Sequence, residues 1–205
     1  MMTANVDHDQ RRLSILEHAF SLFAESGYHR VTYQKIADRC GISRTTIYRY
    51  FQNKEQIFDF AIKEANGKLN TMIEKVLDRK DWSAGEKLIR VLHITVRLLA
   101  DNRLFLTVVL DYLLSRKDKG TVVSRKVRRH TFGMKHLLDR LLREADEQGE
   151  LSVSQAAVAA AHLFGMLESF VLNLTVTDVL DEKDCLNLID HYIEGLTVTQ
   201  ENVKM

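Results

Sequence analysis

Apolar residues recur every three or four positions over most of the chain, which is the spacing of one face of an α-helix. No proline occurs among the 205 residues, so the strongest helix breaker is missing. No alternating runs of β-branched residues stand out as candidate strands. The pattern predicts an all-α fold of about nine helices. The longer helices are expected at 10–26, 54–77, 83–100, 103–115, 121–147, 152–174 and 182–196.

Two short helices, each with a clear N-cap residue, are expected after the first long helix. Thr32 and Ser43 each stand where a helix N-cap is expected. Gly41 lies between them, at a position where the end of a helix commonly needs a left-handed residue. Two short helices joined by a glycine turn form the helix-turn-helix pattern, whose second helix enters the major groove of DNA.

The second of these short helices has two unlike faces. Ile47 and Phe51, four residues apart, are expected to point inward. The exposed face carries hydrogen-bond donors and planar groups, namely Arg44, Thr45, Thr46, Tyr48, Arg49 and Tyr50. An arginine can bind guanine through two hydrogen bonds, and hydroxyl groups can hold phosphates. The face therefore favours DNA recognition, and the alternative is a helix pair whose tyrosines only pack on neighbours.

At these residues the chain resembles a known family. From 15 to 58 it is similar to the DNA-binding domain of the TetR family of bacterial transcriptional regulators. The resemblance rests on many positions that carry the residue types of the family's motif. They are especially Gly27, Thr32, Ile36, Ala37, Gly41, Ile42, Tyr48, Tyr50, Phe51, Asn53 and Lys54. It implies a double-stranded DNA-binding regulator, usually a repressor, which acts as a homodimer on a palindromic operator.

The resemblance also implies roles for single residues. Candidates for base edges are Gln34, Arg44, Thr45 and Tyr50, and candidates for phosphate contacts are Thr32, Tyr33, Thr46, Tyr48 and Lys54. Arg44 stands at a position that varies in the family, so the operator sequence does not carry over. The expected domains are a helix-turn-helix domain at 1–53 and a helical effector-binding and dimerisation domain at 54–205.

Charge is distributed unevenly along the chain, although the formal net charge is only +1. Positions 10–54 carry eight Lys and Arg against three acidic residues, whereas 144–205 carries twelve acidic residues against two lysines. A basic N-terminal part suits a nucleic-acid-binding end. The basic run 116–130 could contact DNA flanks or an acidic ligand, or it could be a solvated face.

The last two helices, near 154–174 and 182–196, carry more apolar surface than one buried face needs. Ser152 and Gln155 form a candidate capping box for the first of them. We expect these helices to form a two-fold dimer contact, as in the family, with burial inside the monomer as the alternative. By resemblance the C-terminal domain would also enclose an unknown small-molecule effector. Its candidate polar anchors are His93, Arg97, His136, His162 and Glu168, although each could be an ordinary surface or core group.

Other function classes have little support. The two cysteines, Cys40 and Cys185, lie far apart without CxxC spacing, so no metal site and no cofactor are expected. No GxSxG, HExxH or P-loop motif suggests an enzyme. The N-terminus does not resemble a signal peptide, and the apolar run 156–167 is too short to span a bilayer, so a cytoplasmic protein is expected. The main rival is a helical partner-binding or structural protein without specific DNA recognition.

Overall fold

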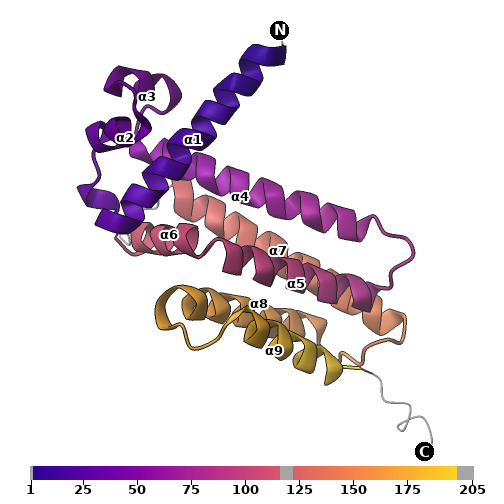
Figure 1. The fold of residues 1–205 in the computed structure, drawn as a ribbon. Helices are drawn as coiled ribbons and strands as arrows, with labels where there is room; N and C mark the ends of the chain where they lie inside the picture. Colours follow the sequence, from indigo (N-terminus) through magenta and orange to yellow (C-terminus); the bar gives the residue numbers. More distant parts are fainter. Residues whose placement is uncertain (1, 116–121, 198–205) are drawn as a thin grey trace, which may run out of the picture. The chain divides into compact units, whose positions relative to one another are not determined.

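The computed structural model describes residues 2–115 and 122–197, with side chains described for 8–114 and 131–197. Within these ranges the chain forms nine α-helices and no β-strand, which confirms the predicted all-α fold (Figure 1). They are α1 Met2–Ser26, α2 Tyr33–Cys40, α3 Arg44–Tyr50, α4 Lys54–Leu77, α5 Ala84–Asp101, α6 Arg103–Ser115, α7 Val122–Glu147, α8 Ala156–Leu172 and α9 Glu182–Glu194. In the basic run, 116–121 and the side chains of 122–130 lie outside the described residues.

The helices pack into two compact units. The first unit comprises Met1–Ala65 and Leu104–Val127, and the second comprises Asn66–Arg103 and Arg128–Met205. This division of packing differs from the predicted domain boundary at residue 53, because the start of α4 and most of α6 belong to the first unit. The reason is a shared apolar cluster, which α4 enters with Phe58 and α6 with Val108 and Tyr112. How function divides between 1–53 and 54–205 stays a prediction.

Aromatic side chains hold the first unit together. Phe58 of α4 stacks on Tyr112 of α6 with ring centroids 4.5 Å apart, and it also stacks on Phe23 of α1 at 5.4 Å. Tyr28, in the short 3-10 helix η1 (Tyr28–Arg30), meets the ring of Tyr112 edge-on at 4.8 Å. Burial of each such ring contributes about 1.5–3 kcal/mol. The helix-turn-helix therefore packs on a buried aromatic cluster.

α1 is longer than the sequence pattern predicted. The apolar spacing begins near Gln10, but the helix begins at Met2. The segment before Gln10 has no glycine or proline that would end a helix. The predicted C-terminal limit is correct, because Gly27 takes φ 75° directly after Ser26.

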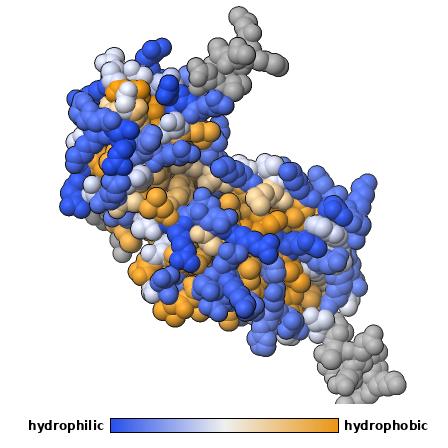
Figure 2. Space-filling view, viewed as in Figure 1, coloured by the Kyte–Doolittle hydropathy of each residue, from blue (hydrophilic) through white to orange (hydrophobic). Residues whose placement is uncertain are grey.

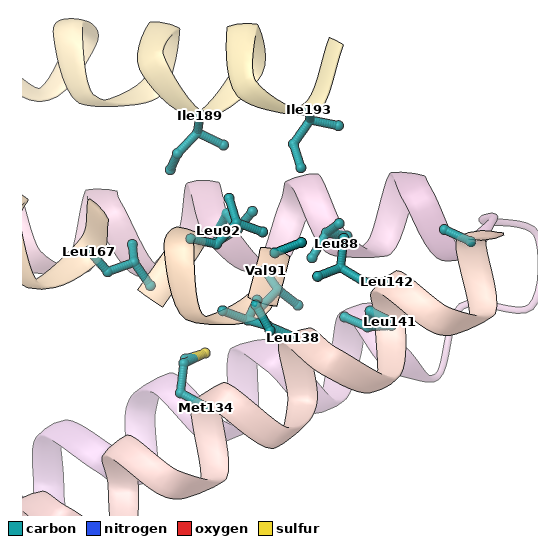
Figure 3. Close-up of a cluster of buried hydrophobic side chains, with 14 of the residues drawn as sticks. Leu88, Val91, Leu92, Met134, Leu138, Leu141, Leu142, Leu167, Ile189 and Ile193 are labelled. Atoms are coloured by element: carbon teal, nitrogen blue, oxygen red, sulfur yellow. The ribbon is translucent and has the colours of Figure 1, made fainter. Parts of the chain in front are cut away.

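Helices α5, α7, α8 and α9 build the core of the second unit together with the second half of α4. Figure 3 shows how their buried side chains meet, and the labelled ones are Leu88, Val91, Leu92, Met134, Leu138, Leu141, Leu142, Leu167, Ile189 and Ile193. Most of them are completely buried. The two apolar C-terminal helices thus each bury one face within the monomer.

The connection between α7 and α8 differs from the predicted one. The predicted capping box of Ser152 and Gln155 is absent: α8 starts at Ala156, and the side chain of Gln155 makes no capping hydrogen bond. The Ser152 amide instead donates to the carbonyl of Leu196 at 2.7 Å, beside an isolated bridge between Leu151 and Thr197. Tertiary pairing with the chain after α9 replaces the local cap.

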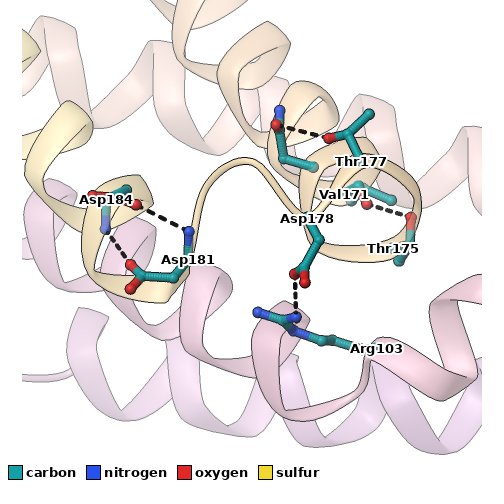
Figure 4. Close-up of polar contacts among 8 residues, drawn as sticks. Arg103, Val171, Thr175, Thr177, Asp178, Asp181 and Asp184 are labelled. Atoms are coloured by element: carbon teal, nitrogen blue, oxygen red, sulfur yellow. Dashed lines mark hydrogen bonds and ion pairs between the residues drawn. The ribbon is translucent and has the colours of Figure 1, made fainter.

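Capping boxes begin both α5 and α9. Ser83 and Glu86 form a capping box at α5, and Asp181 forms one at α9 with Asp184 as its partner (Figure 4). Between α8 and α9 lies η2, a π-helical segment over Asn173–Thr177. It is followed by Asp178, whose φ is 50° and whose carboxylate accepts a hydrogen bond from Arg103 at 3.0 Å (Figure 4).

The segment Ala156–Thr177 is long and apolar enough to cross a membrane by length and composition, with 22 residues and a mean hydropathy of 1.5. It is longer than the run 156–167 considered from the sequence. Its buried side chains, Ala156, Ala159, Ala160, Leu163, Leu167, Phe170 and Leu174, alternate with exposed ones at helical spacing. Core helices of soluble proteins have the same composition, so the feature alone does not indicate a membrane span.

Candidate nucleic-acid interface

Local hydrogen bonds fix the turn between α2 and α3. The side chain of Thr32 accepts from the Lys35 amide at 3.3 Å, and that of Ser43 accepts from the Thr46 amide at 3.0 Å. Gly41 has φ 64°, and its amide donates to the carbonyl of Asp38 at 3.2 Å. Both predicted N-caps and the predicted left-handed glycine are therefore confirmed.

The two faces of α3 are as unlike as its sequence indicates. Ile47 and the following Phe51 are completely buried. Arg44, Thr45, Tyr48 and Arg49 are exposed as predicted, whereas Thr46 and Tyr50, which were also predicted on the exposed face, are half-buried. The Tyr50 ring packs against the first unit's core and lies 4.9 Å from the ring of His8. This geometry leaves an outward ridge of two arginines and a tyrosine on a supported helix.

Three of the candidate side chains, Tyr33, Tyr48 and Arg44, contact one another in sequence through a ring stack and a hydrogen bond. The Tyr33 and Tyr48 rings stack almost parallel, with centroids 4.7 Å apart and an interplanar angle of 5°. The Tyr33 hydroxyl donates to the carbonyl of Phe51 at 3.1 Å, and burial raises the pKa of Tyr33 above its usual value. The Arg44 guanidinium donates to the Tyr48 hydroxyl at 3.1 Å. Tyr33 therefore has a contact inside the protein, in addition to its predicted phosphate role.

Lys54 lies in a different setting from the one expected. Its ammonium donates to the carbonyls of Tyr28 at 2.9 Å and Val31 at 2.8 Å, and it lies 4.4 Å from the centre of the Tyr28 ring. These bonds tie the start of α4 to the chain before α2. The predicted phosphate contact is not tested by this geometry, but the structure adds a bracing role that the sequence did not indicate.

The remaining candidates and the charges around them are on α2 and α1. Gln34 is exposed, and its amide donates to the carboxylate of Asp38 at 2.7 Å. Arg39 forms a two-bonded ion pair with Glu25 of α1, at 3.0 and 2.8 Å. This pairing lowers the pKa of Glu25. Among the basic side chains described here, Arg44 and Arg49 carry the positive charge of the α3 ridge.

Comparison with known proteins agrees with this geometry. Residues 15–60 match the model of the bacterial regulatory proteins of the tetR family. A fatty acid metabolism regulator protein of Bacillus subtilis is 30% identical over 168 residues, which span 81% of this chain and 84% of that protein. The chain belongs to the tetR family.

Solved structures extend the likeness over nearly the whole tetR-family chain. A structure assigned as a fatty acid metabolism regulator of Clostridium perfringens is 26% identical, covers 91% of this chain and all of its own, and has a TM-score of 0.71. A TetR transcription regulator from Haloarcula marismortui has a TM-score of 0.74 at 16% identity over 93% of this chain, which shows the shared fold. This tetR-family protein is a DNA-binding transcriptional regulator.

The five candidate effector residues of the tetR-family protein are dispersed. His93 of α5 pairs with Asp190 of α9 at 2.6 Å, and Arg97 lies 3.7 Å from Glu182. His162 is exposed and contacts the Tyr192 hydroxyl at 3.4 Å, while the structure places His136 and Glu168 at the surface. In the part of the chain that the structure describes, no hydrogen bond or ion pair joins two of the five.

Sequence reasoning missed the stack of Tyr33 on Tyr48 and the carbonyl contacts of Lys54. Both join residues on different elements, so helical periodicity carries no signal for them. The bond between Arg44 and Tyr48 was detectable, because residues four apart lie side by side on a helix.

Proposed function

We propose that this regulator is a homodimeric repressor of fatty acid metabolism genes, which a fatty acid or its thioester releases from a near-palindromic operator. The observation that carries the DNA-reading part is the outward α3 ridge on its buried Ile47 and Phe51 support. The metabolic role is transferred from the fatty acid metabolism regulators of Bacillus subtilis and Clostridium perfringens, to which this chain is similar.

A dimer is needed because one α3 ridge contacts too few bases to make operator affinity much higher than affinity for other DNA. Two ridges related by a two-fold axis would read half-sites about one helical turn apart, or slightly more. In the proposed complex, base edges are contacted by Gln34, Arg44, Thr45 and Tyr50. Phosphates are contacted by Thr32, Tyr33, Thr46, Tyr48 and Lys54. Arg49, exposed on the same ridge, adds positive charge next to the DNA.

Surface composition supports α8 and α9 as the dimer contact. The exposed side of α8 includes Val158, Ala161, Gly165 and Leu172, and α9 exposes Leu188. Val158 is 44% exposed, Leu172 52% and Leu188 43%, which is high for large apolar side chains. Figure 2 shows hydrophobic residues among hydrophilic ones over the end of the molecule where Figure 1 draws α8 and α9. Small residues on α8 let a partner helix approach closely.

The effector would act by shifting the population of DNA-binding conformations, which requires a different affinity for each. His93, Arg97, His136, His162 and Glu168 remain the candidate anchors for the polar end of such a ligand. His93 is the best placed, because its ring joins α5 to α9 through Asp190 and its side chain is 23% exposed. A ligand carboxylate that displaced Asp190 would change the packing of these two helices.

The test begins with selection of operators from genomic fragments by the purified protein. We expect near-palindromes beside fatty acid metabolism genes, and affinity that falls steeply as salt rises. Saturated and unsaturated fatty acids, free and as thioesters, are then titrated into the protein–operator complex. Selection of unrelated sites would contradict the metabolic role, and the absence of release by every ligand would contradict the effector class.

A further inference from the structure

The Arg44 guanidinium, expected to read a base, is already held in the free protein. It donates to the Tyr48 hydroxyl at 3.1 Å, and its central carbon lies 5.5 Å from the centre of the Tyr48 ring. Arg44 and Tyr48 are four residues apart on α3, so both project from the same side of the helix. An exposed arginine without such a partner would sample many rotamers.

Tyr48 is itself fixed from a second helix. One face of its ring stacks on Tyr33 of α2 at a 5° interplanar angle. The Tyr33 hydroxyl donates to the carbonyl of Phe51, the completely buried residue that directly follows α3. The path from the buried core to Arg44 therefore consists of one hydrogen bond, one ring stack and one further hydrogen bond.

A side chain held in its bound geometry loses less conformational entropy when it meets its target. A guanidinium has five N–H donors, so one bond to Tyr48 leaves others for the two acceptors of guanine. A planar contact also demands correct orientation, because bidentate recognition tolerates little rotation. Restriction of Arg44 should thus raise discrimination between bases more than general DNA affinity.

We propose that Tyr48 is a positioning residue that orients Arg44 for base reading, with Tyr33 as the support of Tyr48. The proposal rests on the base-reading role given to Arg44 in the proposed function. Under this proposal Tyr33 acts inside the protein by supporting Tyr48. Discrimination between bases by Arg44 then depends on two tyrosines that do not contact the base.

The main test is a double-mutant cycle on a selected operator and on variants of it changed at single base pairs. Tyr48→Phe keeps the ring and removes the hydroxyl. We expect it to lower discrimination about tenfold at the one base pair that Arg44→Ala also affects, as for loss of a hydrogen bond to a charged group. In the Arg44→Ala background Tyr48→Phe should have no further effect on discrimination.

The matched control is the cycle of Tyr48→Phe with Arg49→Ala. Arg49 is an exposed arginine on the same helix and has no described bond to Tyr48, so the two effects should add. If Tyr48→Phe instead weakens binding equally at every base pair and in both backgrounds, Tyr48 serves only as a phosphate contact and the positioning role is wrong.

A second readout uses the free protein and no DNA. NMR relaxation of the Arg44 Nε–H group should show restricted motion in the native chain and greater motion in Tyr48→Phe and in Tyr33→Leu, which removes the stack. Unchanged motion in both variants overturns the positioning role alone. If Arg44→Ala leaves base discrimination unchanged, the base-reading role in the proposed function fails, whatever the motion of Arg44.

Discussion

Lys54 and Arg44 are both basic residues of the first unit, but their cationic groups lie in different surroundings. The Lys54 ammonium is held by two backbone carbonyls and a tyrosine ring, and its side chain is half-buried. The Arg44 guanidinium lies at the surface, and its hydrogen-bond partner among the described residues is the Tyr48 hydroxyl. A cation used for bracing and a cation available to a ligand can thus be told apart by their partners.

Arg44→Ala should remove base-specific affinity, with a loss of about 1–3 kcal/mol confined to one base position. The loss should not change protein stability, because Arg44 is exposed. Competitive titrations against the selected operator and a scrambled one measure the difference. Equal weakening on both sequences would show that Arg44 contacts phosphate instead.

Lys54→Ala should lower stability as well as DNA affinity. Its loss leaves the carbonyls of Tyr28 and Val31 without the ammonium donor, which costs about 1–3 kcal/mol. Thermal unfolding of the purified variant measures this cost. Lys63→Ala, an exposed change on the same helix, is the control and should stay within about 0.5 kcal/mol of the native protein. An unchanged midpoint in Lys54→Ala would refute the bracing role.

At the scale of the element, α2 and α3 are held at their angle by a turn that only a few residue types can adopt. Gly41 has a left-handed backbone, and no heavy atom lies within 4 Å of the position that a Cβ would occupy there. The need for glycine is therefore conformational and does not arise from crowding. The N-caps Thr32 and Ser43 then set where each helix begins.

Gly41→Ala should destabilise the first unit by about 1–2 kcal/mol, the cost of left-handed backbone for a residue with a Cβ. Gly41→Asn should cost less, since asparagine tolerates this conformation. Chemical denaturation of both variants compares them directly. Equal losses would indicate that space at the turn, rather than backbone conformation, requires glycine.

The start of α5 is fixed by a serine that caps the helix and contacts a distant carboxylate. The Ser83 hydroxyl caps the helix and also donates to the Glu150 carboxylate at 2.9 Å, and the Gly85 amide donates to the same oxygen at 2.8 Å. Ser83→Ala should therefore cost about 1–2 kcal/mol, at the upper end for a cap. Ser154→Ala, an exposed serine before α8, is the control and should be nearly neutral in the same denaturation experiment.

At the scale of the whole molecule, the chain divides into two packing units that share three of its helices. α4, α6 and α7 each contribute residues to both units, and each passes between them without a glycine- or proline-rich linker. The proposed dimer contact lies entirely in the second unit, on α8 and α9. DNA reading and subunit pairing are thus assigned to different packing units.

Ala161→Arg should convert the dimer into a monomer, because a charge on the exposed small-residue side of α8 would be buried at the subunit contact. The helix content should be unchanged. Sedimentation measures the mass, and operator titration should show a large loss of affinity. Glu147→Arg on the exposed end of α7 is the control and should remain dimeric. A dimeric Ala161→Arg protein would exclude this α8 surface from the interface.

Local chemistry was predictable from the sequence to a large extent. The caps at Thr32 and Ser43 and the left-handed glycine at 41 depend on residues within a few positions, so these predictions were correct. The cap at Ser152 was wrong because a partner 44 positions away, Leu196, takes its amide. Local rules fail where a distant segment offers a better hydrogen bond.

The sequence alone determined the helical class, the helix-turn-helix and the residues of its outward ridge, because periodicity, caps and one left-handed glycine act over short distances along the chain. Only the tertiary structure decided that α4 and α6 support the helix-turn-helix, that carbonyls hold Lys54, and that Tyr33 stacks on Tyr48. These contacts depend on how separate helices pack, and packing is set by the shapes of many side chains at once.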